Sequence, residues 1–140
     1  MIKQLLQRMG FATTQPSNRQ ATTVAKTPAV TILEVTDANF ETVVLTSNKL
    51  AIVDFWAEWC QPCQIMSAYV GFLAQEYGDR LLIAAMDVDE NPQTAERYII
   101  MGLPTLLLMQ NGVEVDRIVG VEEYQTIKAR VESLLNAGPA

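Results

Sequence analysis

The chain has 140 residues, 49% of them apolar, which is enough for one domain with a hydrophobic core and a short extension. Two cysteines and no histidine exclude histidine-based catalysis and zinc sites built from cysteine and histidine within one chain. Four of the ten basic residues precede Glu34, whereas all sixteen acidic residues lie at or after it. The part of the chain from Glu34 onward is therefore acidic, which does not favour nucleic acid as a partner.

Residues 1–29 have the composition of an extension. Within them, residues 12–28 are rich in Thr, Ser, Gln and Asn and predict a flexible linker. Apolar residues at helical spacing precede this linker and predict a short amphipathic helix: Ile2, Leu5, Leu6 and Met9. We expect a flexible, basic N-terminal extension, with a frayed terminus, a transit peptide and a weak membrane-surface contact as open interpretations. No stretch approaches the ~18 apolar residues of a membrane span.

From residue 30 onward the pattern predicts alternating strands and helices. Strands are expected at 30–35, 50–56, 81–88, 105–110 and 113–119, and helices after residue 37 and at about 60–77, 92–98 and 122–135. The runs at 50–56 and 81–88 are mostly apolar, as in strands buried on both faces. Asn111-Gly112 predicts a tight hairpin between the last two strands. The order predicts an α/β fold with a central five-stranded mixed sheet flanked by helices on both faces.

Two of the expected helices carry more detailed predictions. Asp37 is placed to cap the helix that follows it, which would carry Phe40, Val43 and Val44 on one face. In the helix at about 60–77, five apolar residues are predicted to face inward: Ile65, Met66, Tyr69, Val70 and Leu73.

Cys60 and Cys63 lie where a buried strand gives way to a helix. Cys60 is expected at the helix N-terminus, where free backbone N–H groups and the helix dipole stabilise a thiolate and lower the pKa of the thiol. Cys63 is one turn further along, close enough to form a disulfide with Cys60, and is expected to be the more buried of the two. Pro62 suits the first helical turn and biases Gln61 toward an extended conformation. The pair therefore predicts a reactive dithiol with Cys60 as the nucleophile.

Other interpretations of the cysteine pair are open. An inert structural disulfide is one, although closing so small a loop adds little stability. Two unrelated thiols are another. A zinc or iron–sulfur site needs four ligands, so with two cysteines it would require a dimer.

Residues 53–63, Val-Asp-Phe-Trp-Ala-Glu-Trp-Cys-Gln-Pro-Cys, resemble the active-site segment of the thioredoxin family. Residues 102–105, Gly-Leu-Pro-Thr, resemble that family's cis-proline loop. The Asn-Gly pair and Gly120 fall where the family has its hairpin and a late glycine. The resemblance covers residues 30–136 and implies a thioredoxin fold for a domain that we place at 30–140.

The resemblance implies a role for each matched residue. Cys60 would attack a substrate disulfide, Cys63 would resolve the mixed disulfide, and Asp54 would be the buried carboxylate that assists proton transfer at Cys63. Leu103 would offer its backbone to an extended substrate segment, next to a cis Pro104. The residues implied in substrate binding are Trp59, Gln61, Pro62, Leu103, Pro104, Gly120 and Val121.

The sequence departs from the family pattern at four positions. Gln61 replaces the usual glycine between the cysteines, and Gln64 replaces the basic residue that commonly follows them, which bears on redox potential and partner choice. Ala68 stands where the family has a helix-kinking proline, so we expect a straighter helix. Ala85 stands where many members have a lysine near the buried carboxylate, so we expect Asp54 to keep a raised pKa.

The resemblance implies a protein thiol–disulfide oxidoreductase that reduces protein disulfides by dithiol–disulfide exchange at Cys60 and Cys63. The redox-active group would be their disulfide, with no cofactor and no metal. Expected partners are disulfide-containing target proteins and an external reductase of the thioredoxin reductase type. We expect a monomer without nucleic acid or stable membrane insertion. The expected location is cytoplasmic, or an organelle stroma or matrix if residues 1–29 are a targeting peptide.

Two alternatives to a reductase are weighed. One is a non-catalytic thioredoxin-fold binding module or subunit, which the intact cysteine pair argues against. The other is an oxidase or isomerase of the same fold. Those relatives often carry a histidine between the cysteines, and its absence here favours a reducing role.

Overall fold

A five-stranded sheet forms the centre of the molecule. The computed structural model describes residues 31–137, and the predicted extension at 1–29 lies outside the described residues. The strands are β1 (Leu33–Glu34), β2 (Leu50–Trp56), β3 (Leu81–Asp87), β4 (Thr105–Gln110) and β5 (Val113–Val119), in the spatial order β1-β3-β2-β4-β5. β1, β3 and β2 are parallel, whereas β4 and β5 are each antiparallel to their neighbours. The predicted mixed sheet is confirmed.

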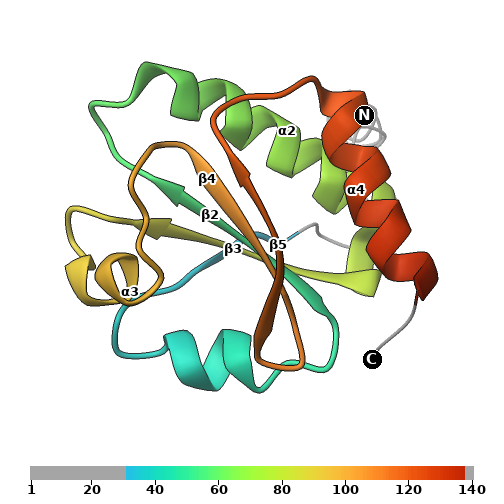
Figure 1. Ribbon diagram of the computed structural model, residues 1–140, viewed down its shortest axis with the longest axis horizontal. Coiled ribbons are helices and arrows are strands. Elements are labelled where there is room, and N and C mark those ends of the chain that lie inside the picture. Colours follow the sequence, from blue (N-terminus) through green and yellow to red (C-terminus); the bar gives the residue numbers. More distant parts are fainter. Residues whose placement is uncertain (1–30, 138–140) are drawn as a thin grey trace, which may run out of the picture.

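Helices cover both faces of this sheet. They are the π-helical turn η1 (Glu41–Leu45), α2 (Gln61–Tyr77), the short 3₁₀ turn η2 (Gly78–Arg80), α3 (Pro92–Arg97) and α4 (Tyr124–Ala137). Figure 1 shows α2 and α4 together on one side of the sheet, and α3 with η1, drawn in cyan, on the other. The α/β architecture is therefore the predicted one.

Each face of the sheet has its own hydrophobic core. Successive side chains of a strand point to opposite faces, so β2 contributes to both cores. Ile52 packs in the core that contains Met66 of α2 and Ile127 of α4. Val53 packs in the core that contains Phe40, just before η1. Burial on both faces explains why β2 and β3 are almost continuously apolar in sequence.

The first strand is shorter than predicted. A strand was expected at 30–35, and of the described residues 31–35 only Leu33 and Glu34 pair, opposite Ala84 and Ala85 of β3. β1 is an edge strand with one neighbour, and Leu33 is 37% exposed. In sequence, the apolar residues of an edge strand resemble those of a central strand. An edge strand has only one neighbouring strand, however, so fewer of its residues are held in the sheet.

The hairpin between β4 and β5 forms at Asn111-Gly112, as predicted. Both residues have positive φ angles, 53° and 80°, which is the backbone of a type I′ turn. A Cβ at position 112 would also lie 3.1 Å from the carbonyl oxygen of Leu45, which is a tight contact that glycine avoids.

The inward face of α2 differs from the prediction at one position. Met66, Val70 and Leu73 are buried and the half-buried Tyr69 packs against the same core, but Ile65 is 48% exposed. The buried residues follow the spacing i, i+4, i+7, whereas Ile65 lies one residue before Met66 and therefore about 100° around the helix. α2 is unbroken through residue 68, and the straighter helix remains a prediction.

Asp37 does not cap the helix that follows it, and that prediction is wrong. Its carboxylate accepts hydrogen bonds from the backbone N–H groups of Gln93 and Thr94, at 3.1 and 2.7 Å, and from the Thr94 hydroxyl at 2.6 Å. These donors belong to the first turn of α3, so Asp37 satisfies the N-terminus of a helix more than fifty residues away.

Candidate active site

Cys60 and Cys63 form a disulfide at the start of α2, with their Cα atoms 5.3 Å apart. β2 ends at Trp56, and a tight turn follows in which the Cys60 N–H donates to the Ala57 carbonyl at 3.1 Å. Cys60 is the N-cap of α2, as predicted. The sulfur of Cys60 therefore lies beside the unpaired N–H groups of a helix start, where a thiolate is stabilised.

The two cysteines are buried to nearly the same extent, 5% and 4% exposed. Cys63 is expected to be the more buried of the two, and in this disulfide form the difference is marginal. Both side chains pack in one small cluster with Ala57, against which Leu103 also packs. The bond between the sulfurs holds both cysteines in this cluster.

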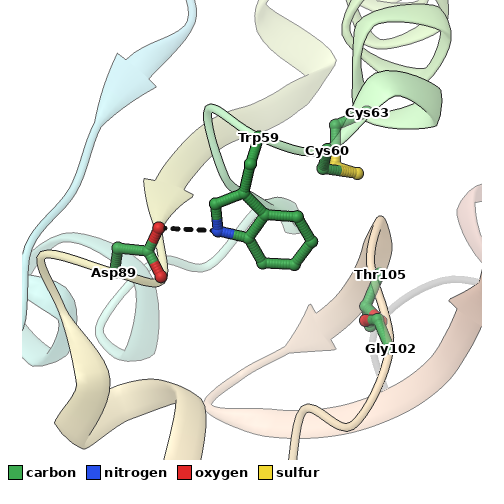
Figure 2. Close-up of a disulfide and its surroundings, with 6 residues drawn as sticks. All are labelled: Trp59, Cys60, Cys63, Asp89, Gly102 and Thr105. Carbon is green, nitrogen blue, oxygen red and sulfur yellow. Dashed lines mark hydrogen bonds between the residues drawn. A yellow bond between two sulfur atoms is a disulfide. The ribbon is translucent and has the colours of Figure 1, made fainter.

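Trp59 is the most prominent exposed side chain beside the disulfide. It is 70% exposed, and its indole Nε1–H donates to a carboxylate oxygen of Asp89 at 2.9 Å. Figure 2 shows this hydrogen bond, with the indole ring between Asp89 and the disulfide. Asp89 lies just after the end of β3, the strand next to β2. Its hydrogen bond therefore fixes the orientation of the Trp59 ring, although the ring is exposed to solvent.

The loop before β4 faces the disulfide. The Leu103–Pro104 peptide bond is cis, as the resemblance implied. The Thr105 hydroxyl donates to the Gly102 carbonyl at 2.7 Å, which closes the loop on itself. Pro104 is buried and its carbonyl accepts the Gly120 N–H at 2.7 Å. Within residues 31–137 no backbone hydrogen bond of Leu103 is seen, so its main chain is open to a partner.

Asp54 lies in the middle of β2 and is 3% exposed. Among the residues that the structure describes, its Oδ1 atom has no hydrogen-bond partner. The side chain lines a pocket of about 330 Å³ that also contains Cys63 and Ser67. Burial raises the pKa of Asp54 to about 7. This carboxyl therefore holds or releases a proton near neutral pH, in a space shared with a cysteine.

Ala85 is the direct neighbour of Asp54 on β3. It lines the same pocket, and the pocket's lining contains two further acidic residues, Glu34 and Glu58, but no basic residue. The structure thus confirms the placement of Ala85 beside the carboxylate. No cation from this lining opposes the effect of burial on Asp54.

The remaining residues implied in substrate binding lie around the disulfide at different depths. Gln61 and Pro62 are exposed in the first turn of α2. Val121 is 38% exposed and follows Gly120, which is held against the loop of Pro104. Leu103 of this loop packs against the disulfide, whereas Asp54 lines a pocket that both cysteines also line.

Sequence reasoning missed three residues at this site. Asp89 orients Trp59, while Glu34 and Ser67 line the pocket of Asp54. The spacing of α2 places residues 60, 63 and 67 on one side of a helix, which is a signal for Ser67. Glu34 and Asp89 depend on which strands are neighbours, and a single sequence does not show this.

The described part of the chain contains neither a cluster of metal-binding side chains nor a helix that could span a membrane. Across residues 31–137, no group of three or more His, Cys, Asp or Glu side chains is arranged to hold a metal ion. No helix in that range is long and apolar enough to cross a membrane.

Comparison with known proteins gives a consistent result. The thioredoxin family model matches residues 31–133, more than half of the chain. A thioredoxin of Acidithiobacillus ferridurans is 45% identical over 104 residues, which cover 74% of this chain and 96% of that protein. Thioredoxin 2 of Chlorobaculum tepidum is 46% identical over 99 residues, 71% of this chain and 91% of that protein.

The chain belongs to the thioredoxin family. It is a protein thiol–disulfide oxidoreductase, and its redox-active group is the Cys60–Cys63 disulfide of the protein itself. A third relative is a bifunctional thioredoxin reductase/thioredoxin of Mycobacterium leprae, 46% identical over 102 residues. That match covers 73% of this chain but 22% of the relative, so the thioredoxin-like part is a minor portion of that protein.

Proposed function

We propose that this thioredoxin-family chain reduces disulfide bonds in other proteins and is itself re-reduced by an external reductase. The observation that carries the proposal is the position of the cysteine pair. Cys60 caps α2 next to an exposed tryptophan and a loop with a free backbone, so a protein segment can approach the nucleophile.

In the reduced protein, the Cys60 thiolate attacks one sulfur of the substrate disulfide. A Cys60–substrate disulfide forms, the substrate S–S bond breaks, and the departing substrate thiolate takes up a proton. Cys63 then loses its proton and attacks the sulfur of Cys60, which releases the second substrate thiolate. Two electrons pass to the substrate, and the protein ends with the Cys60–Cys63 disulfide.

Asp54 is proposed as the proton acceptor for Cys63. Both residues line the same pocket, so a proton can pass between them directly or through water. With a pKa of about 7, the carboxyl is divided between its two forms near neutral pH. This division suits a group that first accepts and later returns a proton.

Residues around the disulfide are proposed to contact the substrate protein. Trp59 supplies exposed aromatic area, and Leu103 supplies main-chain groups for an extended segment. The remaining proposed contacts are Gln61, Pro62, Pro104, Gly120 and Val121.

The reductase that restores the dithiol is proposed to be of the thioredoxin reductase type. The name of the Mycobacterium leprae relative joins the two activities in one protein, which supports this pairing. We further propose that the chain acts as a monomer in the cytoplasm, or in an organelle if residues 1–29 direct it there.

Insulin reduction in the presence of dithiothreitol tests the proposal. The protein should accelerate the precipitation of reduced insulin chains well above the rate with dithiothreitol alone. Cys60→Ser should remove this acceleration, because the described residues contain no other thiol than Cys63. No acceleration by the wild-type protein would contradict the proposal and would favour a binding module instead.

A further inference from the structure

The residue that follows α3 has an uncommon backbone conformation. The Ile99 N–H donates to the Glu96 carbonyl at 3.0 Å, and the Ile100 N–H donates to the Ala95 carbonyl at 2.9 Å. These two bonds end α3 in a Schellman motif with Ile99 directly after the C-cap, Tyr98. Ile99 has a φ of 53°. Glycine normally occupies this left-handed position, and a β-branched side chain there is strained.

The surrounding structure holds this turn in place. One guanidinium nitrogen of Arg117, on β5, donates to the Tyr98 carbonyl at 2.7 Å, and another donates to the Ile99 carbonyl at 3.1 Å. Glu114 in turn pairs with the same guanidinium at 2.8 Å. The conformation of Ile99 is therefore imposed by its neighbours and does not reflect a preference of isoleucine.

Burial does not compensate for this strain. Ile99 is 65% exposed, and Met101, two residues later, is 86% exposed. The intervening Ile100 packs against the core and accounts for the hydrophobic contact of this segment. Because the Ile99 side chain buries little area, it adds little to folding. A strained residue that does not serve stability points to a role in function.

Ile99 and Met101 line a groove of about 470 Å³ that adjoins the active site. The same groove is lined by Leu103, which packs against the disulfide, and by Trp59, which directly precedes Cys60 in the chain. Glu96 is the one charged residue in its lining. The groove is thus continuous with the surface on which a substrate protein must lie, and its character suits an apolar occupant.

We propose that Ile99 and Met101, here called the apolar ledge, determine substrate preference by binding an apolar side chain that flanks the attacked cysteine of a substrate protein. The inference rests on the proposed function, because it requires a protein substrate at Cys60. Contact with the ledge stabilises the complex in which Cys60 attacks, so it raises kcat/KM for substrates that carry such a side chain. Small disulfides without a neighbouring side chain gain nothing from it.

The test uses pre-reduced protein and two disulfide-linked peptides that differ only beside the cysteine, with Leu-Cys-Leu in one and Ser-Cys-Ser in the other. The second-order rate constant for oxidation of the protein by each peptide is measured. The variants are Ile99→Gly and Met101→Ser. Val113→Ser is the control, since Val113 is 61% exposed at the hairpin, the end of β4 away from the disulfide.

Wild-type protein should prefer the leucine peptide, and each ledge variant should lose about fivefold of that preference, as expected when apolar contact area is removed. The rate with the serine peptide and the behaviour of Val113→Ser should not change. Ile99→Gly should keep or raise the melting temperature, because glycine fits the left-handed position. A stable variant with a lower preference separates this role from a structural one.

A preference that is equal in wild type and both ledge variants would overturn the inference. A parallel loss of rate with both peptides would also overturn it, because that result indicates general damage to the site. If wild-type protein oxidises with neither peptide, the proposed function itself fails, and this outcome is distinct from an unchanged preference.

Discussion

Asp54 is the residue whose environment departs most from that of an ordinary side chain. It is nearly fully buried, its Oδ1 atom lacks a partner among the described residues, and burial raises its pKa to about 7. Folding therefore favours the protonated form. As pH rises above the unfolded value of ~3.9, the folded state loses stability relative to the unfolded state, and the loss stops growing above pH 7. Its size is roughly 4 kcal/mol.

Asp54→Asn should stabilise the oxidised protein at pH 8, by roughly 2–4 kcal/mol, because the buried ionised group is removed. At pH 4 the stabilisation should nearly vanish, since Asp54 is then protonated in the folded state. Urea unfolding of both proteins at the two pH values measures this. The variant should also resolve mixed disulfides more slowly at neutral pH. Equal stability differences at pH 4 and pH 8 would contradict the assignment.

Ala85→Lys should lower the pKa of Asp54. Position 85 is opposite Asp54 on β3 and lines the same pocket, so an ammonium group there favours the charged carboxylate. An NMR titration of the Asp54 carboxyl in wild type and variant measures the shift. Ala85→Met, of similar length and without charge, is the control and should not lower the value. A titration that does not move with lysine would show that position 85 is not coupled to Asp54.

At the scale of single residues, the sequence predicted the reactive residues better than it predicted the residues that surround them. Cys60 at the helix start followed from the cysteine spacing after a buried strand, and Asp54 beside Ala85 followed from the resemblance to the thioredoxin family. Asp89 and Glu34 could not be predicted, because their positions depend on strand order and register. The small size of the difference in burial between the two cysteines was not foreseen either, since the disulfide holds both in one cluster.

At the scale of elements, α3 depends on a distant residue for its N-terminal cap. α3 has only six residues, and Asp37 accepts two backbone N–H bonds from its first turn. Desolvation raises the pKa of Asp37, but the hydrogen bonds from Thr94 and Gln93 outweigh it and hold the pKa below its ordinary value. The carboxylate thus stabilises the fold above its unfolded pKa, and this contribution is lost as pH falls through the folded pKa.

Asp37→Ala should lower the free energy of unfolding by about 1–2 kcal/mol at pH 7, the usual effect of removing a helix cap. Asp37→Asn should lose less, because the amide oxygen still accepts a hydrogen bond. Denaturant unfolding at pH 7 and pH 3 measures both. The difference between wild type and Asp37→Ala should shrink as pH falls through the lowered pKa of the folded protein, because the carboxyl then becomes protonated. An unchanged stability of Asp37→Ala at pH 7 would be inconsistent with this cap.

Element types and most boundaries were predicted because their patterns are strong and local. β2, β4 and β5 have the predicted bounds, and the Asn-Gly turn joins the last two. Errors arose where a local pattern fits two environments. Asp37 looks like the cap of the next helix but caps α3, and Ile65 looks like a core residue although it lies on the outer flank of α2.

At the scale of the whole molecule, the five described strands lie within residues 33–119, and described residues form a hydrophobic core on each face of the sheet. Deletion of residues 1–29 should therefore leave the melting temperature and insulin reduction essentially unchanged. Thermal unfolding and the insulin assay on the shortened protein measure this. A marked fall in either value would show that the extension contributes to the folded domain.

The overall topology was predictable because family motifs are spread over the chain and agree with its alternation of strands and helices. The preference for particular substrates was not. The apolar ledge depends on the backbone of Ile99, and a residue's positive φ cannot be read from an isoleucine in sequence.

Trapping of the mixed disulfide tests the central claim most directly, that Cys60 attacks a protein disulfide and Cys63 resolves the product. Reduced Cys63→Ser protein is mixed with insulin, and the adduct is located by mass spectrometry. We predict a stable disulfide between Cys60 and insulin, with no such adduct accumulating for wild type. Absence of the adduct at Cys60, or multiple turnovers by Cys63→Ser at the wild-type rate, would contradict the account.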